Sequence, residues 1–150
     1  METNLFDKVD KKLITSIIRD SNFIEMCDLF YGENPFVAKD SSNEVFLDNI
    51  LLPLINFYVF LQKNKWLTVL DAIQKRQINR NQTEYLLLKN KFNKEKNPID
   101  LFLLCCSCDK NKIRVNKNFQ FNQKWGNKIF NRSIENRLYD YHSKVYKKDQ

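Results

Sequence analysis

Glycine is nearly absent from this chain, and that scarcity narrows the folds and sites that the chain can form. The sequence has 2 glycines, Gly32 and Gly126, in 150 residues, where average usage of about 7% would supply about 10. Loops that cradle phosphate, such as G-x-G-x-x-G and the P-loop, need clustered glycines because only glycine lets the backbone approach the ligand closely. Two isolated glycines therefore argue against a nucleotide-binding enzyme with a loop of this kind.

Positive charge is concentrated in the second half of the chain. Residues 1–74 contain 7 Lys and Arg against 11 Asp and Glu, whereas residues 75–150 contain 18 against 7, and the whole chain has a net charge of +7. The basic residues of the second half alternate with Phe, Trp, Tyr and Asn more than with Glu. This asymmetry predicts a basic surface for an anionic partner such as nucleic acid. Charged residues that only keep a helical surface solvated are the alternative.

The length of the chain predicts one domain, because a typical domain has about 100–150 residues and 43% of this chain is hydrophobic. The opening residues METNLFDKVDKK lack the apolar stretch of a secretory signal, and no run approaches 18 apolar residues. We therefore expect no membrane span and no secretion. The expected location is the cytoplasm, or wherever the nucleic acid is, including an organelle or a virus-infected cell.

The hydrophobic pattern of the first half predicts both helices and short strands. Apolar residues recur at helical spacing in 7–19. The short apolar runs 23–30 and 44–48 are typical of buried strands. From Asn49 onward the pattern becomes helical.

The second half is predicted to contain helices that flank a β-hairpin. The expected helix caps are Asn81 or Thr83 and Asn97, the last of these followed by Pro98 in a first turn. Residues 112–125 alternate apolar and polar side chains around Lys117-Asn118, which is the pattern of a hairpin. A last helix is predicted over 133–147.

Three of the four cysteines, Cys105, Cys106 and Cys108, lie near the end of a predicted helix, and His142 is the single histidine. A zinc site normally uses two paired Cys or His units, and this spacing does not match one. We expect these thiols and that of Cys27 to be reduced and to pack as small hydrophobic groups. No metal site and no catalytic residue are predicted.

Four phrases carry the most specific signal in the sequence. They are DLFYGENPF at 28–36, EVFLDNILLPLINFYVFL at 44–61, YLLLKNKFNKEKNPIDLFLL at 85–104 and KIRVNKNFQFNQKWGNK at 112–128. In this order they resemble the Dam-type DNA adenine-N6 methyltransferases. Their counterparts are the cofactor loop D/E-x-F-x-G-G-G, a strand–Asn-Asp-Ile–x-x-Pro–helix motif, a helix pair with Y-x-x-L-R-x-x-F/Y-N, and the recognition hairpin R-x-N-x-x-G-x-F-N-x-P-x-G-x-R/K.

The resemblance implies an α+β fold, a shortened remnant of the Rossmann-like methyltransferase fold. It places a degenerate cofactor part in residues 1–62 and a nucleic-acid recognition part in 63–150. The second part would contain a helical insert and the β-hairpin.

The chain departs from the family pattern in the cofactor region. Gly32 alone remains of the glycine-rich loop, and Asn49 stands where the family has an acid, with Asp48 one residue early. The Asp-Pro-Pro-Tyr motif, which holds the flipped adenine and follows the hairpin in the family, does not occur in this sequence. The resemblance therefore implies no methylation by the isolated chain and no cofactor. Residual S-adenosylmethionine binding through Asp28, Gly32 and Asp48 stays open.

The resemblance instead implies that the hairpin binds DNA. Arg114 is the candidate for reading a base, because arginine can donate two hydrogen bonds to guanine O6 and N7; a solvated strand residue is the alternative. The remaining candidates support the hairpin or contact phosphate, and they are Lys112, Asn116, Lys117, Asn122, Lys124 and Lys128. Trp125 belongs either to the core or to a stacking surface.

The favoured function is that of a non-catalytic DNA-binding protein derived from a DNA adenine methyltransferase. One alternative is a subunit of a split methyltransferase, because two short strands would leave a sheet edge for a partner to cover. The other is a structural or inhibitory subunit of a viral or organellar nucleic-acid assembly, for which RNA would serve as well as DNA. A partner protein or a homo-oligomer is expected.

Overall fold

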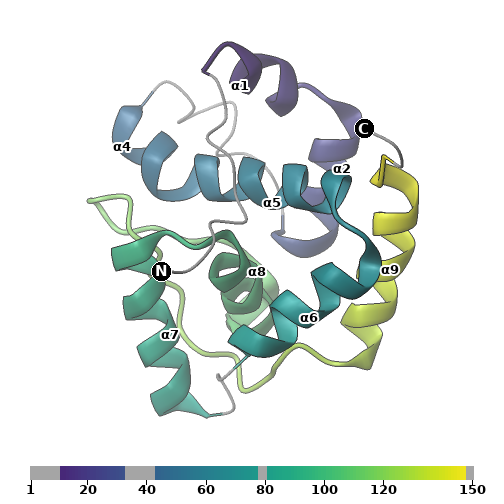
Figure 1. Ribbon diagram of the computed structural model, residues 1–150. Coiled ribbons are helices and arrows are strands. Elements are labelled where there is room, and N and C mark those ends of the chain that lie inside the picture. Colours follow the sequence, from purple (N-terminus) through teal and green to yellow (C-terminus); the bar gives the residue numbers. More distant parts are fainter. Residues whose placement is uncertain (1–10, 33–42, 78–80, 148–150) are drawn as a thin grey trace, which may run out of the picture.

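Helices form nearly all of the regular structure in the computed structural model, which describes residues 11–32, 43–77 and 81–147 (Figure 1). The helices are α1 (Lys11–Ile18), α2 (Ser21–Phe30), α4 (Glu44–Phe46), the π-helix η1 (Leu47–Leu51), α5 (Leu52–Lys63), α6 (Trp66–Arg76), α7 (Gln82–Glu95), α8 (Pro98–Ser107), the 3-10 turn η2 (Asp109–Asn111) and α9 (Arg132–Val145). The predicted helix at 133–147 is confirmed as α9, and the part of 7–19 that falls within the described residues is confirmed as α1.

The helix α8 is the centre of the fold. All of its residues are buried, and α2, α5, α6 and α7 pack around it (Figure 1). A helix that is apolar on every side can be stable in a small protein only in such a position. Phe102 stacks on Phe57 with ring centroids 4.8 Å apart, and it meets Phe30, Tyr31 and Phe130 edge-on.

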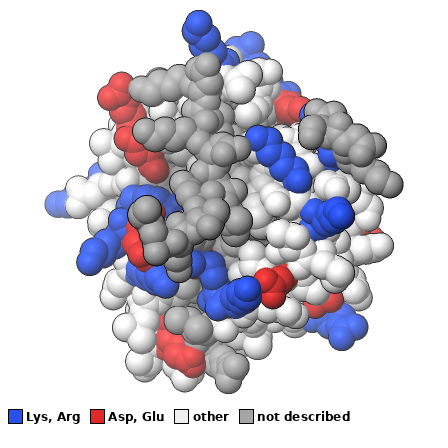
Figure 2. Space-filling view, in the orientation of Figure 1, with Lys and Arg blue, Asp and Glu red and all other residues white. Residues whose placement is uncertain are grey.

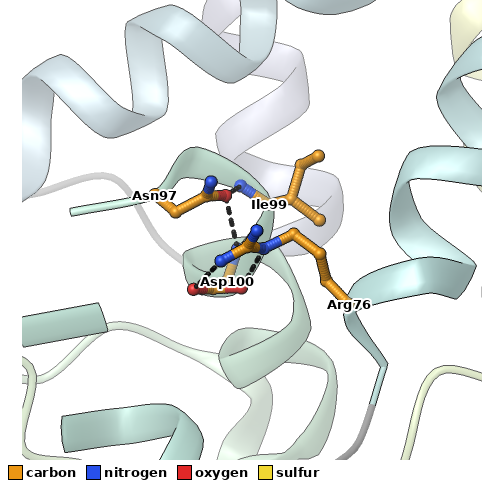
Figure 3. A network of polar contacts seen from close by, with 4 residues as sticks. All are labelled: Arg76, Asn97, Ile99 and Asp100. Atoms are coloured by element: carbon orange, nitrogen blue, oxygen red, sulfur yellow. Dashed lines mark hydrogen bonds and ion pairs between the residues drawn. The ribbon is translucent and has the colours of Figure 1, made fainter. Parts of the chain in front are cut away.

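One carboxylate lies inside this apolar centre. Asp100 is fully buried on α8, and its two oxygens accept hydrogen bonds from Nε and Nη2 of Arg76 at 2.7 and 2.9 Å (Figure 3). The Asn97 side chain accepts from the backbone N–H groups of Ile99 and Asp100, so the first turn of α8 is also capped. The bidentate pair offsets the cost of removing the charge from water.

Side-chain oxygens of Asn and Asp start most of the helices. The capping residues with a hydrogen bond to the first turn are Asp20, Asn43, Asn81, Asn97 and Asn131. The predictions of Asn97 as a cap and of Pro98 in the first turn are confirmed, and Asn81 is the cap of α7 in preference to Thr83. The high asparagine content of the chain thus has a structural use.

The two predicted strands are wrong, because both segments are helical. Residues 23–30 belong to α2, and its buried residues Phe23, Met26, Cys27 and Phe30 follow the helical spacing i, i+3, i+4, i+7. Residues 44–48 begin a helix at the Asn43 cap.

The second of these helices continues from α4 through η1 into α5. The π-turn η1 ends at Leu51, two residues before Pro53, which has no N–H to donate to the carbonyl four residues earlier. The wider turn accommodates the proline without ending the helix. The motif that resembles a strand followed by a helix is therefore one long helix in this chain.

The predicted β-hairpin at 112–125 is also wrong. The described residues contain no β-strand, only two isolated bridges, Cys108 with Trp125 and Val115 with Phe121. The alternation of side chains is real, since Ile113, Val115 and Phe121 pack on the core while Arg114 and Asn122 are exposed. The backbone groups, however, bond largely to helix side chains and to separate segments instead of to a second strand.

The α+β, Rossmann-like fold class is consequently contradicted for the part of the chain that the structure describes. The sheet edge that motivated a split enzyme is not there either, because no sheet is present in this part. One hydrophobic cluster extends through the helices on both sides of the predicted boundary at residue 62, which lies near the end of α5.

The helical stretch Glu44–Lys63 is long and apolar enough to cross a membrane by length and composition, with a mean hydropathy of 1.5. Of the window that passes this test, 56% is buried inside the fold, and α5 packs against α8, α9 and α2. These contacts are those of a core helix.

We predict that Arg76→Met lowers the free energy of unfolding by about 3 kcal/mol, because it leaves the buried Asp100 carboxylate without its partner. Lys75→Met on the same helix is the control. It removes an ion pair to Asp71 whose side chains are 74% and 62% exposed, which is expected to cost less than about 1 kcal/mol. Urea unfolding measures both, and equal losses in the two variants would contradict this role of the buried pair.

Candidate nucleic-acid interface

The segment from 112 to 128, here called the basic loop, connects η2 to α9. It carries all seven of the predicted nucleic-acid contacts. Lys112, Arg114, Lys117, Asn122 and Lys124 are exposed, and Asn116 and Lys128 are half-buried. The first five are therefore available to an anionic partner, whereas the last two make hydrogen bonds within the protein.

Helix α7 holds the inner side of the basic loop. The Asn93 side chain accepts a hydrogen bond from the Phe121 N–H at 2.9 Å and donates to the Phe121 carbonyl at 3.0 Å, as a neighbouring strand would. The buried Tyr85 hydroxyl donates to the Gln123 carbonyl at 2.7 Å. One face of α7 carries Tyr85, Leu88, Phe92 and Asn93. The spacing in the phrase Y-x-x-L-K-x-x-F-N therefore places Tyr85 and Asn93, which bond to the basic loop, on the same side of the helix.

The π-turn η1 holds the tip of the basic loop. The Asn49 amide donates to the carbonyls of Asn118 and Phe119 at 3.4 and 3.1 Å. The rings of Phe46 and Phe119 meet edge-on at 5.8 Å, and in Figure 1 the tip lies beside α4. Asn49 stands where the family pattern has an acid, and here its amide positions the loop. Sequence reasoning missed this contact because it joins residues about 70 positions apart.

Asn116 organises the turn at the tip. Its Oδ1 accepts from the N–H groups of Asn118 and Gln120 at 2.9 and 3.0 Å, and its own N–H donates to the Gln120 carbonyl. Phe119 has a φ of 58°, a left-handed conformation that costs free energy outside glycine and asparagine. We conclude that Asn116 supports the loop from within, which is one of the two roles predicted for it.

The exposed cations of the basic loop have few acidic neighbours. Lys124 lies 3.9 Å from Asp109, with its side chain 79% exposed, and such a pair contributes little. Arg114 has no ion pair with a described residue. Figure 2 shows Lys and Arg side chains on several parts of the visible face, with acidic side chains among them.

Lys128 is held at the inner end of the basic loop. Its Nζ donates to Oδ1 of Asn111 at 2.6 Å, and the Asn111 amide donates to the carbonyls of Cys105 and Cys106 at the end of α8. Trp125 packs against the core and pairs with Cys108, which favours the core alternative for this tryptophan.

The three predicted cofactor residues lie on different elements. Asp28 and Asp48 are exposed on α2 and η1. A Cβ added to Gly32 would lie 2.4 Å from Cβ of Lys112, so Lys112 occupies the space beside this glycine. Residues 33–36 of the phrase that resembles the cofactor loop lie outside the described residues.

The prediction that the cysteines pack inside the core is confirmed. All four are free and buried, and the described residues contain no group of three or more His, Cys, Asp or Glu that could hold a metal ion. Burial, with a smaller effect of the Asp28 charge, raises the pKa of Cys27 to about 12.

We predict that the native protein does not react with Ellman's reagent near pH 8, because all four thiols are buried and out of reach of the reagent. For Cys27 the thiolate is also scarce, because pH 8 is far below its pKa. In denaturing urea four thiols should react. Rapid release of one equivalent from the native protein would contradict this packing.

We also predict that Asn93→Ala loosens the basic loop. It leaves the N–H and C=O of Phe121 without partners, which should cost about 1–3 kcal/mol of stability and speed amide exchange at Phe121. Asn90→Ala, on the exposed side of the same helix, is the control and should change neither. Unaltered exchange at Phe121 in the Asn93 variant would contradict the anchoring role.

A family-model comparison agrees with the motif pattern. The model described as D12 class N6 adenine-specific DNA methyltransferase matches residues 11–149, a span that contains the whole helical core and the basic loop. Members of this family use S-adenosylmethionine. The resemblance to the Dam-type enzymes is thus confirmed at the level of the family, and the chain belongs to the D12 class of N6 adenine-specific DNA methyltransferases.

Proposed function

We propose that this chain binds duplex DNA through the basic loop, and that the residues described here supply recognition without methyl transfer. The observation that carries the proposal is the combination of exposed cations and a fixed backbone. Lys112, Arg114, Lys117 and Lys124 project from a loop that α7 and η1 hold at Phe119, Phe121 and Gln123.

A fixed loop is suited to recognition, because little conformational entropy is lost when it binds. The major groove of DNA is about 12 Å wide and admits a helix or a ribbon. The loop is two chain segments wide beside the turn at 116–119, because the Asn116 N–H donates to the Gln120 carbonyl at 2.9 Å. Arg114 lies near this turn, with its carbonyl bonded to the N–H of Asn122 at 2.8 Å, so its side chain starts from a defined position.

The positions of Asp28, Gly32 and Asp48 support the second part of the proposal. The side chains of Asp28 and Asp48 are on separate helices, and Lys112 occupies the space beside Gly32. The sequence contains no Asp-Pro-Pro-Tyr phrase to hold an extrahelical adenine.

Incubation with duplex DNA and methyl-labelled S-adenosylmethionine should leave the DNA unlabelled, and labelled N6-methyladenine would overturn this part.

For DNA binding itself, we predict that Arg114→Ala weakens binding to the preferred duplex by about 5- to 150-fold, the equivalent of about 1–3 kcal/mol for one lost base contact. Arg19→Ala is the matched control, since Arg19 is exposed between α1 and α2 and carries the same charge. Fluorescence anisotropy with a panel of duplexes at fixed salt measures both.

The variants distinguish the proposal from its alternatives. Loss of sequence preference in Arg114→Ala, but not in Arg19→Ala, supports base reading. Binding that is independent of salt and equal in the two variants would contradict DNA binding by the loop. Equal, salt-dependent affinity for DNA and RNA of any sequence would support a structural role in a nucleic-acid assembly instead.

A further inference from the structure

A pocket of about 250 Å³ opens where α2 and α8 end and α9 begins. Its apolar wall includes Phe30 at the end of α2 and Cys106 on α8. Its polar wall includes Ser133 and Arg137 on α9, and Lys128 at the end of the basic loop. Neither the motif comparison nor the predicted contacts assign a role to this pocket or to Arg137.

Two cations converge on the pocket without an acidic partner. Lys128 is bonded to the amide oxygen of Asn111 at 2.6 Å, and Arg137 donates to the Leu29 carbonyl at 3.4 Å. No Asp or Glu is among the described residues that line the pocket. No carboxylate among the described lining residues therefore neutralises either cation, and neutral acceptors hold them in place. An anion that entered would be attracted by both.

The apolar wall strengthens this attraction. Burial raises the pKa of the Cys106 thiol, and the positive charge of Arg137 opposes that shift. The Arg137 guanidinium therefore lies close enough to this apolar wall to interact with it electrostatically. Charges beside a low-dielectric wall interact more strongly than charges in water. The two side chains repel a cationic group and attract an anionic one.

The size of the pocket limits the anion. Pockets that enclose a drug-sized ligand or cofactor have volumes of about 300–1,000 Å³, and this one is smaller. It therefore suits one phosphate group with part of its sugar. Because Lys128 belongs both to the pocket and to the basic loop, a phosphate held here lies next to whatever the loop binds.

We infer that this pocket binds one backbone phosphate of the DNA, held between Lys128 and Arg137, with the Ser133 hydroxyl as a further donor. The inference rests on the proposed function, since the phosphate belongs to the duplex that the basic loop contacts. It assigns to Arg137 a role in affinity that is independent of base sequence, in contrast to Arg114.

Salt dependence of binding tests this inference, because each neutralised phosphate contributes about 0.9 to the slope of log K against log salt. Arg137→Gln should reduce the slope by up to about 0.9 and weaken all duplexes equally. The double variant Lys128→Gln/Arg137→Gln should lose no more than about 0.9 in total, because both side chains hold the same phosphate. Lys147→Gln, an exposed cation just beyond α9, is the matched control and should leave the slope unchanged.

The outcomes distinguish a failure of the proposed function from a failure of the pocket inference alone. If the unaltered chain shows no salt-dependent binding to DNA, the proposed function fails and the inference fails with it. If the chain binds and Arg114→Ala weakens binding, but Arg137→Gln behaves like Lys147→Gln, the pocket inference alone is overturned. A loss of about 1.8 in the double variant would place the two cations on different phosphates and would also overturn it.

A titration followed by the NMR signals of the Arg137 Nε–H and the Ser133 N–H identifies the source of the phosphate. We expect both signals to move with stoichiometric duplex and to be little affected by an equal concentration of inorganic phosphate. Saturation by inorganic phosphate, with no response to duplex, would show that the pocket takes a free phosphate group and would contradict the inference. Arg137 is exposed, so its glutamine variant should fold normally, which its unfolding curve can verify.

Discussion

The burial of one charged side chain on the central helix constrains how the neighbouring helices pack. Helix α8 is enclosed along its whole length and carries Asp100 into the centre of the fold. That carboxylate is tolerable there only because Arg76 reaches it from α6, so the position of α6 is fixed by charge. Phe102, two residues further, lies about 200° around the helix axis and stacks on Phe57 of α5. The ion pair and the aromatic stack thus hold two neighbours on opposite sides of one helix.

Side-chain amides provide hydrogen bonds to the basic loop that a neighbouring β-strand would otherwise provide. Asn93 bonds to both backbone groups of Phe121, and Asn49 bonds to two carbonyls at the tip of the basic loop. Since every buried backbone group needs a partner, a chain rich in asparagine can hold an extended segment against helices without forming a ladder. The loop keeps the side-chain alternation of a hairpin, but only two backbone hydrogen bonds join its arms, from the Asn116 N–H to the Gln120 carbonyl and from the Asn122 N–H to the Arg114 carbonyl.

The family, several helix caps and the helices of the second half could be predicted from the sequence. The strands at 23–30 and 44–48 and the hairpin at 112–125 were predicted wrongly. Asn97, Pro98 and the last helix follow from local rules that the tertiary structure does not override. Residues 23–30 were ambiguous because a short apolar run fits a strand or a helix equally well. The choice depends on which faces are buried, and this is determined by packing against α5 and α8.

The candidate nucleic-acid interface could also be predicted only in part from the sequence. The charges of the basic loop, including Lys112, Arg114 and Lys117, are visible in the sequence because exposed residues depend little on context. The contacts of Asn49, Asn93 and Arg137 are tertiary, and no spacing rule connects α9 with the end of α2. The family phrase that contains Tyr85 and Asn93 was a usable signal, since both residues lie on the face of α7 that holds the loop.

The two glycines bear on how the basic loop could vary. Gly32 lies against Lys112, and Gly126 lies against Cys108 with its N–H bonded to the Ser107 carbonyl at 2.8 Å. A side chain at either position would push apart backbone segments that touch at the two ends of the loop. Backbone segments are in close contact at these two ends, whereas the tip between them is held to the helices by side chains such as Asn49 and Phe46. Such a construction permits the tip to vary in sequence or length while the helical core stays unchanged.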